Sequence, residues 1–175
     1  MENSAKLTVT PQKTSFYFLL LSFLIPVLLA WVALKYSWFT PAVTNKGELL
    51  SPPLQLSTTQ LPSELKNTWV LLYIADDNCQ QCEQAQYLMQ QIDVALGKET
   101  ARVQLASNHM SLQQHMAVIQ DPKLQQAASG HLYLADPLGV IMLKYPLAEG
   151  SDKQIRTAKD VLSDLRKLLK LSRIG

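Results

Sequence analysis

The sequence predicts an α/β domain that is tethered to a single N-terminal membrane-spanning helix. Two observations lead to this prediction: an uncharged apolar run at residues 16–34, and a regular alternation of strand-like and helix-like segments from residue 68 onward. The length of 175 residues suits one domain with an appendage. A net charge of +2 without any basic block gives no indication of a nucleic-acid partner, and we expect none.

Residues 15–35 form the predicted transmembrane helix. The stretch from Phe16 to Leu34 would rise about 28 Å as a helix, which is close to the thickness of a bilayer's hydrocarbon core. Tyr17 and Trp31 lie near its ends, as interfacial aromatic residues often do. The alternative is a cleaved signal peptide, but the run is longer than a typical signal-peptide core and no clean cleavage site follows it. We therefore predict an uncleaved anchor.

The charges around the span indicate its orientation. Lys6 and Lys13 precede it, and after Lys35 no charge appears before Lys46. The positive-inside rule then favours a cytoplasmic N-terminus. In a bacterium the cysteines would lie in the periplasm, which is an oxidising compartment. We expect a single-pass protein of the inner membrane with a periplasmic soluble domain.

Prolines mark the segment that follows the span. They stand at Pro41, Pro52, Pro53 and Pro62, and they indicate an extended linker whose later part packs on the domain. The predicted organisation is a cytoplasmic tail at 1–14, a transmembrane helix at 15–35, a linker leading into the domain at 36–66, and the domain at 67–175.

From Thr68 the segments follow the order strand, helix, strand, helix, strand, turn, strand, helix. Residues 69–74 are almost continuously apolar, which is typical of a strand buried on both faces. Apolar spacing predicts a helix over 81–96, with Gly97 as its C-terminal cap. The remaining predicted elements are a strand at 102–106, a helix at 112–119, strands at 131–135 and 140–145 around a turn at 136–139, and a final helix that starts with a capping box at Ser151 and Gln154. This order is that of the thioredoxin-like fold.

Cys79 and Cys82 are the only cysteines, and they lie where the first strand gives way to the first helix. A thiol at a helix N-terminus is favoured as thiolate by the backbone N–H groups and the helix dipole. The pattern predicts a redox site or a soft-metal site. In the functional interpretation the more exposed Cys79 attacks a client, and Cys82 resolves the mixed disulfide. The alternative is a structural disulfide that only staples the loop.

The residues around the cysteine pair limit which kinds of site it can form. Negative charge on Asp76 and Asp77 raises the pKa of a nearby thiol and opposes the helix dipole, so we expect a site that is not strongly oxidising. Structural zinc needs four ligands, which one cysteine pair and three scattered histidines do not supply. Glu83 follows Cys82, so the haem-attachment motif is absent.

Histidines supply further candidate ligands. In a thioredoxin-like fold the loop before His131 approaches the cysteine loop, so Cys79, Cys82 and His131 would form a two-sulfur, one-nitrogen set suited to copper. The alternative for His131 is a polar strand-end residue without a ligand role. His109 and Met116 also carry copper-binding atoms and would share one helix face, but the pattern favours an ordinary helix with methionine toward the core.

With these features the chain resembles Sco-type proteins. The resemblance lies in the single span, the proline-containing linker, the strand leading to two close cysteines, and the Tyr-Leu-Ala-Asp-x-x-Gly hairpin at 133–139. It implies a membrane-anchored thioredoxin-like protein that binds copper through two cysteines and a histidine and acts on the dinuclear copper site of cytochrome c oxidase. The chain is also similar to small membrane proteins of Gram-negative bacteria associated with oxidase biogenesis. Oxidoreductases of this fold usually place a cis-proline near the position of Gly130.

We therefore expect a membrane-anchored assembly factor whose CxxC pair reduces the copper site of cytochrome c oxidase or delivers copper to it. The expected partners are the inner membrane and an oxidase subunit or its assembly factors. Two alternatives stay open: a general periplasmic thiol–disulfide oxidoreductase, and a non-catalytic scaffold for oxidase assembly.

Overall fold

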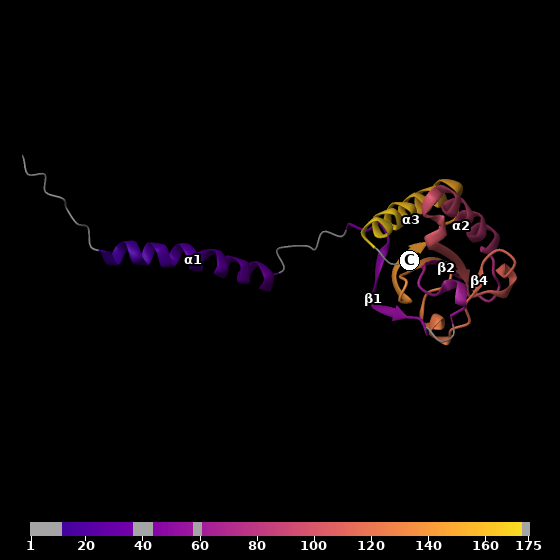
Figure 1. Cartoon of the computed structure of the whole chain (residues 1–175), viewed down its shortest axis with the longest axis horizontal. Coiled ribbons are helices and arrows are strands. Elements are labelled where there is room, and N and C mark those ends of the chain that lie inside the picture. Colours follow the sequence, from indigo (N-terminus) through magenta and orange to yellow (C-terminus); the bar gives the residue numbers. More distant parts are fainter. Residues whose placement is uncertain (1–11, 37–43, 58–60, 173–175) are drawn as a thin grey trace, which may run out of the picture. The chain divides into compact units, whose positions relative to one another are not determined.

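The computed structural model describes residues 12–36, 44–57 and 61–172, and it divides into two compact units (Figure 1). The first unit contains the helix α1 (Gln12–Lys35). Residues 15–35 of this helix contain an 18-residue window with a mean hydropathy of 2.5, and they are long and apolar enough to cross a membrane. A membrane anchor and an N-terminal signal sequence both satisfy this criterion. Most of the predicted tail, residues 1–11, and residues 37–43 of the predicted linker lie outside the described residues.

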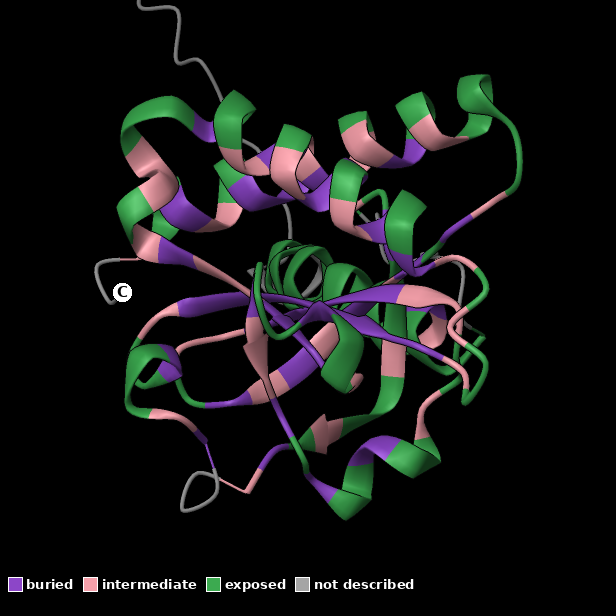
Figure 2. Ribbon diagram, turned by 90° about the vertical axis from the view of Figure 1, so that its right-hand side faces the viewer, coloured by how far each residue is buried: buried purple, intermediate pink, exposed green. Residues whose placement is uncertain are grey.

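The second unit is built on one mixed sheet of six strands in the order β1-β6-β5-β2-β3-β4. The parallel pairs are β2 with β3 and β3 with β4, and the other neighbours are antiparallel. Figure 2 shows helices α2 and α3 together over one face of this sheet, with their exposed residues turned away from it. The elements are β1 (Glu48–Gln55), β2 (Trp69–Ile74), α2 (Cys82–Leu96), β3 (Val103–Ser107), β4 (Ala117–Val118), β5 (His131–Ala135), β6 (Val140–Pro146) and α3 (Ser151–Leu171).

Strand β2 lies inside the sheet and separates two apolar clusters. Its residues Trp69, Leu71 and Tyr73 face the cluster under α2 and α3, whereas the alternate residues of the strand face a cluster on the other side. Because successive side chains of a strand point to opposite faces, a strand covered on both faces must be apolar throughout. The continuous apolar run of 69–74 is thus explained, and its prediction as a buried strand is confirmed.

The predicted α/β thioredoxin-like architecture is confirmed in its main elements. Helix α2 begins and ends within a residue or two of its predicted bounds. The same holds for strand β3 and for the hairpin of β5 and β6. Gly97 is the C-cap of α2 with φ +61°, and Gly139 adopts φ +82° in the hairpin turn. Both backbone conformations are ones that glycine adopts without steric cost.

The prediction of a helix over 112–119 is wrong. The segment forms a short 3-10 helix, η3 (Met110–Leu112), and then the two-residue strand β4. The N–H of Ile119 donates to the carbonyl of Ser107 at 2.8 Å, which holds the returning chain beside β3. Leu112, Met116 and Ile119 have helical spacing, yet they are buried through this irregular path. Sheet pairing therefore outweighs the local helical pattern.

The predicted capping box of the last helix does not form. Gly150, with φ +97°, is the N-cap of α3, and no side chain caps it, so Ser151 is already inside the helix. The positive φ turns the chain sharply from β6 into α3, and glycine adopts such a backbone more readily than serine.

The later part of the segment predicted as a linker belongs to the second unit. Strand β1 pairs antiparallel with β6 at the edge of the sheet, and the folded unit begins at Thr44. Leu56 and Leu61 are buried in the second cluster, so this part of the segment packs on the domain as predicted, whereas Leu49 is exposed.

The carboxylate of Asp121 connects two segments that pack on the second cluster. Its ionisation is expected to make the stability of the domain depend on pH. Its carboxylate accepts hydrogen bonds from the backbone N–H groups of Ser57 at 2.6 Å and Lys123 at 3.0 Å. Burial acts to raise the pKa of Asp121, but hydrogen bonds from Ser57 and Lys123 and the charge of Lys123 outweigh it and lower the pKa. A lowered pKa contributes stability that is complete above about pH 4 and is lost as the pH falls through the folded-state value.

We therefore expect the Asp121→Asn variant to lose less stability on acidification than the unaltered protein does. Urea unfolding between about pH 3 and pH 6 measures this difference. An identical pH dependence in both proteins would show that this carboxylate is not coupled to folding.

Candidate functional site

The cysteine pair lies in the turn between strand β2 and helix α2, at the N-terminus of that helix. After Ile74 the chain turns, with the N–H of Cys79 donating to the carbonyl of Asp76 at 3.1 Å. The Asp76 carboxylate accepts from the N–H of Gln80 at 3.4 Å, and Cys82 is the first residue of α2. Cys79 has φ +50°, a left-handed backbone that a residue with a Cβ rarely adopts. Strain of this kind is often found at functional sites, where the surrounding structure maintains it.

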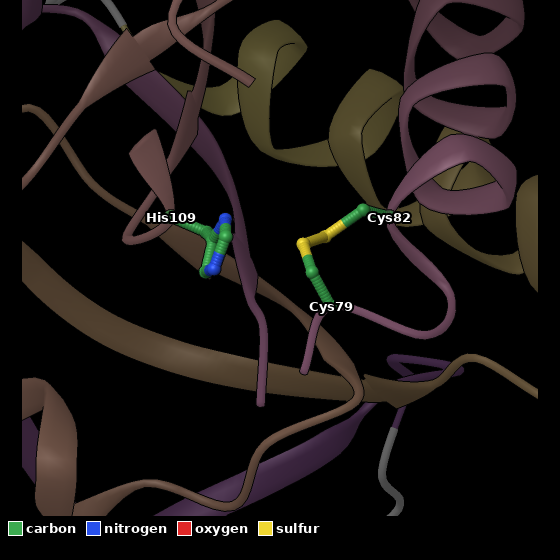
Figure 3. Close-up of side chains that lie close together, drawn as sticks. All are labelled: Cys79, Cys82 and His109. Atoms are coloured by element: carbon green, nitrogen blue, oxygen red, sulfur yellow. A yellow bond between two sulfur atoms is a disulfide. The ribbon is translucent and has the colours of Figure 1, made fainter. Parts of the chain in front are cut away.

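The two cysteines form a disulfide, with their Cα atoms 5.2 Å apart (Figure 3). Cys79 is partly exposed, whereas Cys82 is only 5% exposed. The prediction that the first cysteine is the more accessible one is thus confirmed. An attacking role for Cys79 stays a prediction, and it agrees with this difference because a client reaches an exposed sulfur more readily than a buried one.

Asn108 joins the ends of two neighbouring strands beside this disulfide. Its side-chain oxygen accepts from the N–H of Ala75 at 2.7 Å, and its side-chain nitrogen donates to the carbonyl of Ala75 at 3.3 Å. The N–H of Asn108 also donates to the carbonyl of Tyr73 at 3.4 Å. These bonds extend the β2–β3 pairing past its last residues and bring the loop after β3 next to the cysteine turn.

The residue that this arrangement presents to the disulfide is His109. The ligand atoms of Cys79, Cys82 and His109 all lie within 4.8 Å of one another, and Figure 3 shows the imidazole ring beside the two sulfurs. His109 is the N-cap of η3, and its Nδ1 accepts from the N–H of Ser111 at 3.3 Å. The Ser111 hydroxyl lies 2.8 Å from the same Nδ1 and 3.5 Å from the Cys79 sulfur. Two sulfurs and one nitrogen at this spacing suit a soft metal ion once the disulfide is reduced.

His131 is not a member of this cluster. It begins β5 opposite Ile74, and its Nδ1 lies 2.7 Å from the carbonyl oxygen of Ser129. Its ring centroid is 6.3 Å from that of Tyr133, in a tilted arrangement. The structure therefore brings Cys79 and Cys82 together with a different histidine, and a ligand role for His131 stays a prediction.

The loop before β5 does approach the cysteine turn, as expected for this fold. A Cβ added to Gly130 would lie 3.9 Å from the side-chain oxygen of Gln81, which stands between the cysteines. Gly130 has φ +70°, and its N–H donates to the carbonyl of Ile74 at 2.7 Å. Proline has no N–H and a fixed negative φ, so it cannot replace this glycine without breaking the contact.

The surroundings of the turn are acidic and polar. Burial, followed by the charge of Asp76, raises the pKa of Tyr73, which keeps its phenol protonated. A pocket of about 660 Å³ adjoins the turn, and Asp76, Asp77 and Asn108 line one part of it. The expectation that the two carboxylates raise the pKa of the Cys79 thiol concerns the reduced protein and stays a prediction.

A ligand role for His109 is not expected from the sequence, because the spacing around it favours an ordinary helix with methionine toward the core. The signal that could have identified it is its position two residues after the end of β3. The carboxyl ends of parallel neighbouring strands meet at the same edge of a sheet, so residues after β2 and after β3 lie close together.

Comparison with known proteins places this domain in a family. Residues 69–121 and 104–172, which together span more than half of the chain, match the family described as transmembrane-like, thioredoxin-like, C-terminal domain. A comparison with curated protein sequences gives no match.

Solved structures with a similar fold have low sequence identity to this chain. A Chlorobium tepidum protein assigned as thiol:disulfide interchange protein DsbE is 18% identical, with a TM-score of 0.42, over 69% of this chain and 96% of its own. A thiol:disulfide interchange protein from Bacteroides sp. is 14% identical, with a TM-score of 0.40, over 71% and 90%. BsSco, a member of the Sco family of cytochrome c oxidase assembly proteins, is 16% identical, with a TM-score of 0.41, over 77% and 99%.

Proposed function

Because the chain belongs to the family of transmembrane-like, thioredoxin-like C-terminal domains, we propose a function that joins a membrane tether to thiol chemistry. The protein is a membrane-anchored assembly factor whose reduced Cys79–Cys82 pair, together with His109, carries Cu(I) as cargo. Its client is the copper site of cytochrome c oxidase, which it loads with copper or keeps reduced. The domain lies on the periplasmic side of the inner membrane.

The observation that carries this proposal is the donor set itself. Thiolate sulfur and imidazole nitrogen are soft and intermediate ligands that select Cu(I) over the hard divalent ions. Three such atoms within 4.8 Å need only small movements to surround one ion. Oxidation to the disulfide removes both thiolates, so the redox state of the pair also controls whether copper is held.

The choice of the oxidase as client is supported by the sequence. The span, the linker, the cysteine pair after a strand and the hairpin at 133–139 together resemble Sco-type proteins. The helix at 15–35 would hold the domain close to a membrane-embedded client.

A Cu(I) titration of the reduced full chain in detergent tests the proposal. We expect one equivalent of Cu(I) to bind tightly against a chromogenic chelator, and the Cys79→Ser/Cys82→Ser variant to lose this binding. His109→Gln should weaken binding, whereas His131→Gln, a matched histidine variant outside the cluster, should not. Cysteine-independent binding would rule out the copper-carrier function, and weakening by the His131 variant alone would assign the third ligand to His131.

A second candidate function is general thiol–disulfide exchange without metal, which the partly exposed disulfide favours. Complementation of a strain that lacks the protein separates the thiol functions from a scaffold. If the chain carrying Cys79→Ser/Cys82→Ser restores oxidase activity, both thiol functions are wrong and the scaffold remains.

A further inference from the structure

Ser111 links the two halves of the proposed metal site. Its hydroxyl oxygen is 2.8 Å from the Nδ1 of His109 and 3.5 Å from the sulfur of Cys79. Its backbone N–H donates to the same Nδ1 at 3.3 Å. The residue belongs to η3, which is anchored by the buried Leu112, and the N–H of Leu112 donates to the carbonyl of His109 at 3.3 Å.

Both contacts of Ser111 engage the same nitrogen of the ring. A neutral imidazole binds a metal through an in-plane lone pair on one nitrogen, and the other nitrogen then carries the proton. Because Ser111 contacts Nδ1, Nε2 is the ring nitrogen that stays available as a metal ligand. In metal sites the second ring nitrogen commonly donates its proton to a nearby oxygen, which orients the ring.

We propose that Ser111 is a positioning residue that holds the ring of His109 so that Nε2, and not Nδ1, binds the metal. This inference rests on the proposed function and adds the ligand atom and its support. In the loaded state Nδ1 carries the proton and donates it to the oxygen of the Ser111 hydroxyl. Protonation of Nδ1 breaks the hydrogen bond that it accepts from the backbone N–H of Ser111, and this N–H cannot itself accept a proton. Only the side chain of Ser111 therefore supports the ring in that state.

This distinction gives Ser111→Ala a specific effect. The alanine variant keeps the backbone contact to Nδ1 in the metal-free protein but has no acceptor for the Nδ1 proton in the loaded protein. We expect roughly 10- to 100-fold weaker Cu(I) binding, the usual effect of removing an outer partner of a metal-bound histidine, with unchanged urea unfolding of the metal-free chain. Ser111→Thr keeps a hydroxyl and should bind nearly as the unaltered protein does.

The experiment uses the reduced full chain in detergent with Cu(I) and a competing chelator. His109→Gln is the reference for complete loss of the third ligand, and His115→Gln is the matched control, since His115 is exposed on the same segment. Because Cu(I) is diamagnetic, nitrogen NMR of histidine-labelled protein also reports which ring nitrogen of His109 is metal-bound.

The outcomes separate this inference from the function on which it rests. Nε2 ligation, together with weaker binding by Ser111→Ala and not by Ser111→Thr, supports it. If His109→Gln weakens binding but Ser111→Ala does not, or if Nδ1 is the metal-bound atom, the role of Ser111 is wrong and the copper function stands. If binding does not depend on the cysteines, both are overturned.

Discussion

Replacing Asp164 by alanine is expected to lower the free energy of unfolding of the second unit by about 3 kcal/mol. Asp164 lies on α3 and is only 2% exposed. One of its carboxylate oxygens accepts hydrogen bonds from the N–H groups of Lys46 at 2.6 Å and Gly47 at 2.9 Å, and from the Tyr145 hydroxyl at 2.9 Å. Alanine would leave these donors without their acceptor, and an unsatisfied buried donor costs about 1–3 kcal/mol.

The effect should be measurable by urea unfolding, with Asp164→Asn and Tyr145→Phe as graded controls. Asparagine keeps an acceptor oxygen without the charge, so its loss should be smaller than that of alanine. Burial, followed by the negative charge of Asp164, raises the pKa of Tyr145, so the phenol stays a donor at ordinary pH. Phenylalanine removes this one donor, and equal stability of all variants would contradict the assigned role of the carboxylate.

Asp164 also shows where prediction from the sequence stops. Residue 164 lies three positions after the buried Val161 and one before the buried Leu165, so helical spacing places it on the buried side of α3. Nothing in this spacing indicates which groups would pair with a buried carboxylate. The structure buries Asp164 because residues 46 and 47, more than a hundred positions earlier, bring two N–H groups to it. A contact of this sequence separation leaves no periodic signal in either segment.

The same reasoning separates the correct predictions from the wrong ones. Strand β2, helix α2 and the hairpin turn at Gly139 are specified by neighbouring residues, through apolar spacing and a backbone that only glycine adopts easily. The strand β4 depends on pairing with β3, and β1 depends on pairing with β6, so local patterns did not indicate them.

The candidate site divides in the same way. The cysteine pair could be predicted because one continuous segment contains the strand, the two cysteines at CxxC spacing and the start of the helix. His109 lies beside the sulfurs because Asn108 extends the β2–β3 pairing, whereas the sequence pattern favours a helix in this segment. If β2 and β3 are assumed to be parallel neighbours, their ends meet at the same edge of the sheet, and residues 108 and 109 are expected beside the cysteine turn.

A chain carrying Cys82→Ser is expected to accumulate covalent complexes with its clients in the cell. In the proposed exchange the Cys79 thiolate attacks one sulfur of a client disulfide, forms a new S–S bond with it, and releases the other client sulfur as a thiolate. Cys82 then attacks the Cys79 sulfur and releases the second client thiol, so the client gains two electrons and the pair becomes a disulfide. Serine cannot perform the second step, and the mixed disulfide on Cys79 persists.

Because Cys82 is buried and Cys79 is partly exposed, the two single variants are expected to trap very different amounts of client. Cys82 is only 5% exposed, so a Cys79→Ser chain presents no accessible thiol and should trap few clients. Non-reducing electrophoresis shows the complexes, reductant releases them, and the double variant is the background control. Equal trapping by Cys79→Ser would mean that the buried sulfur of Cys82 attacks clients as readily as Cys79 does.

The identity of the trapped proteins decides between the two thiol functions. Mass spectrometry of complexes on the Cys82→Ser chain should find a copper-binding subunit of the oxidase or one of its assembly factors if the client is the one proposed. A broad set of unrelated periplasmic proteins would instead indicate a general oxidoreductase. Because the trap depends on Cys79 alone, it reports the client even where copper binding through His109 fails, which makes it independent of the titration.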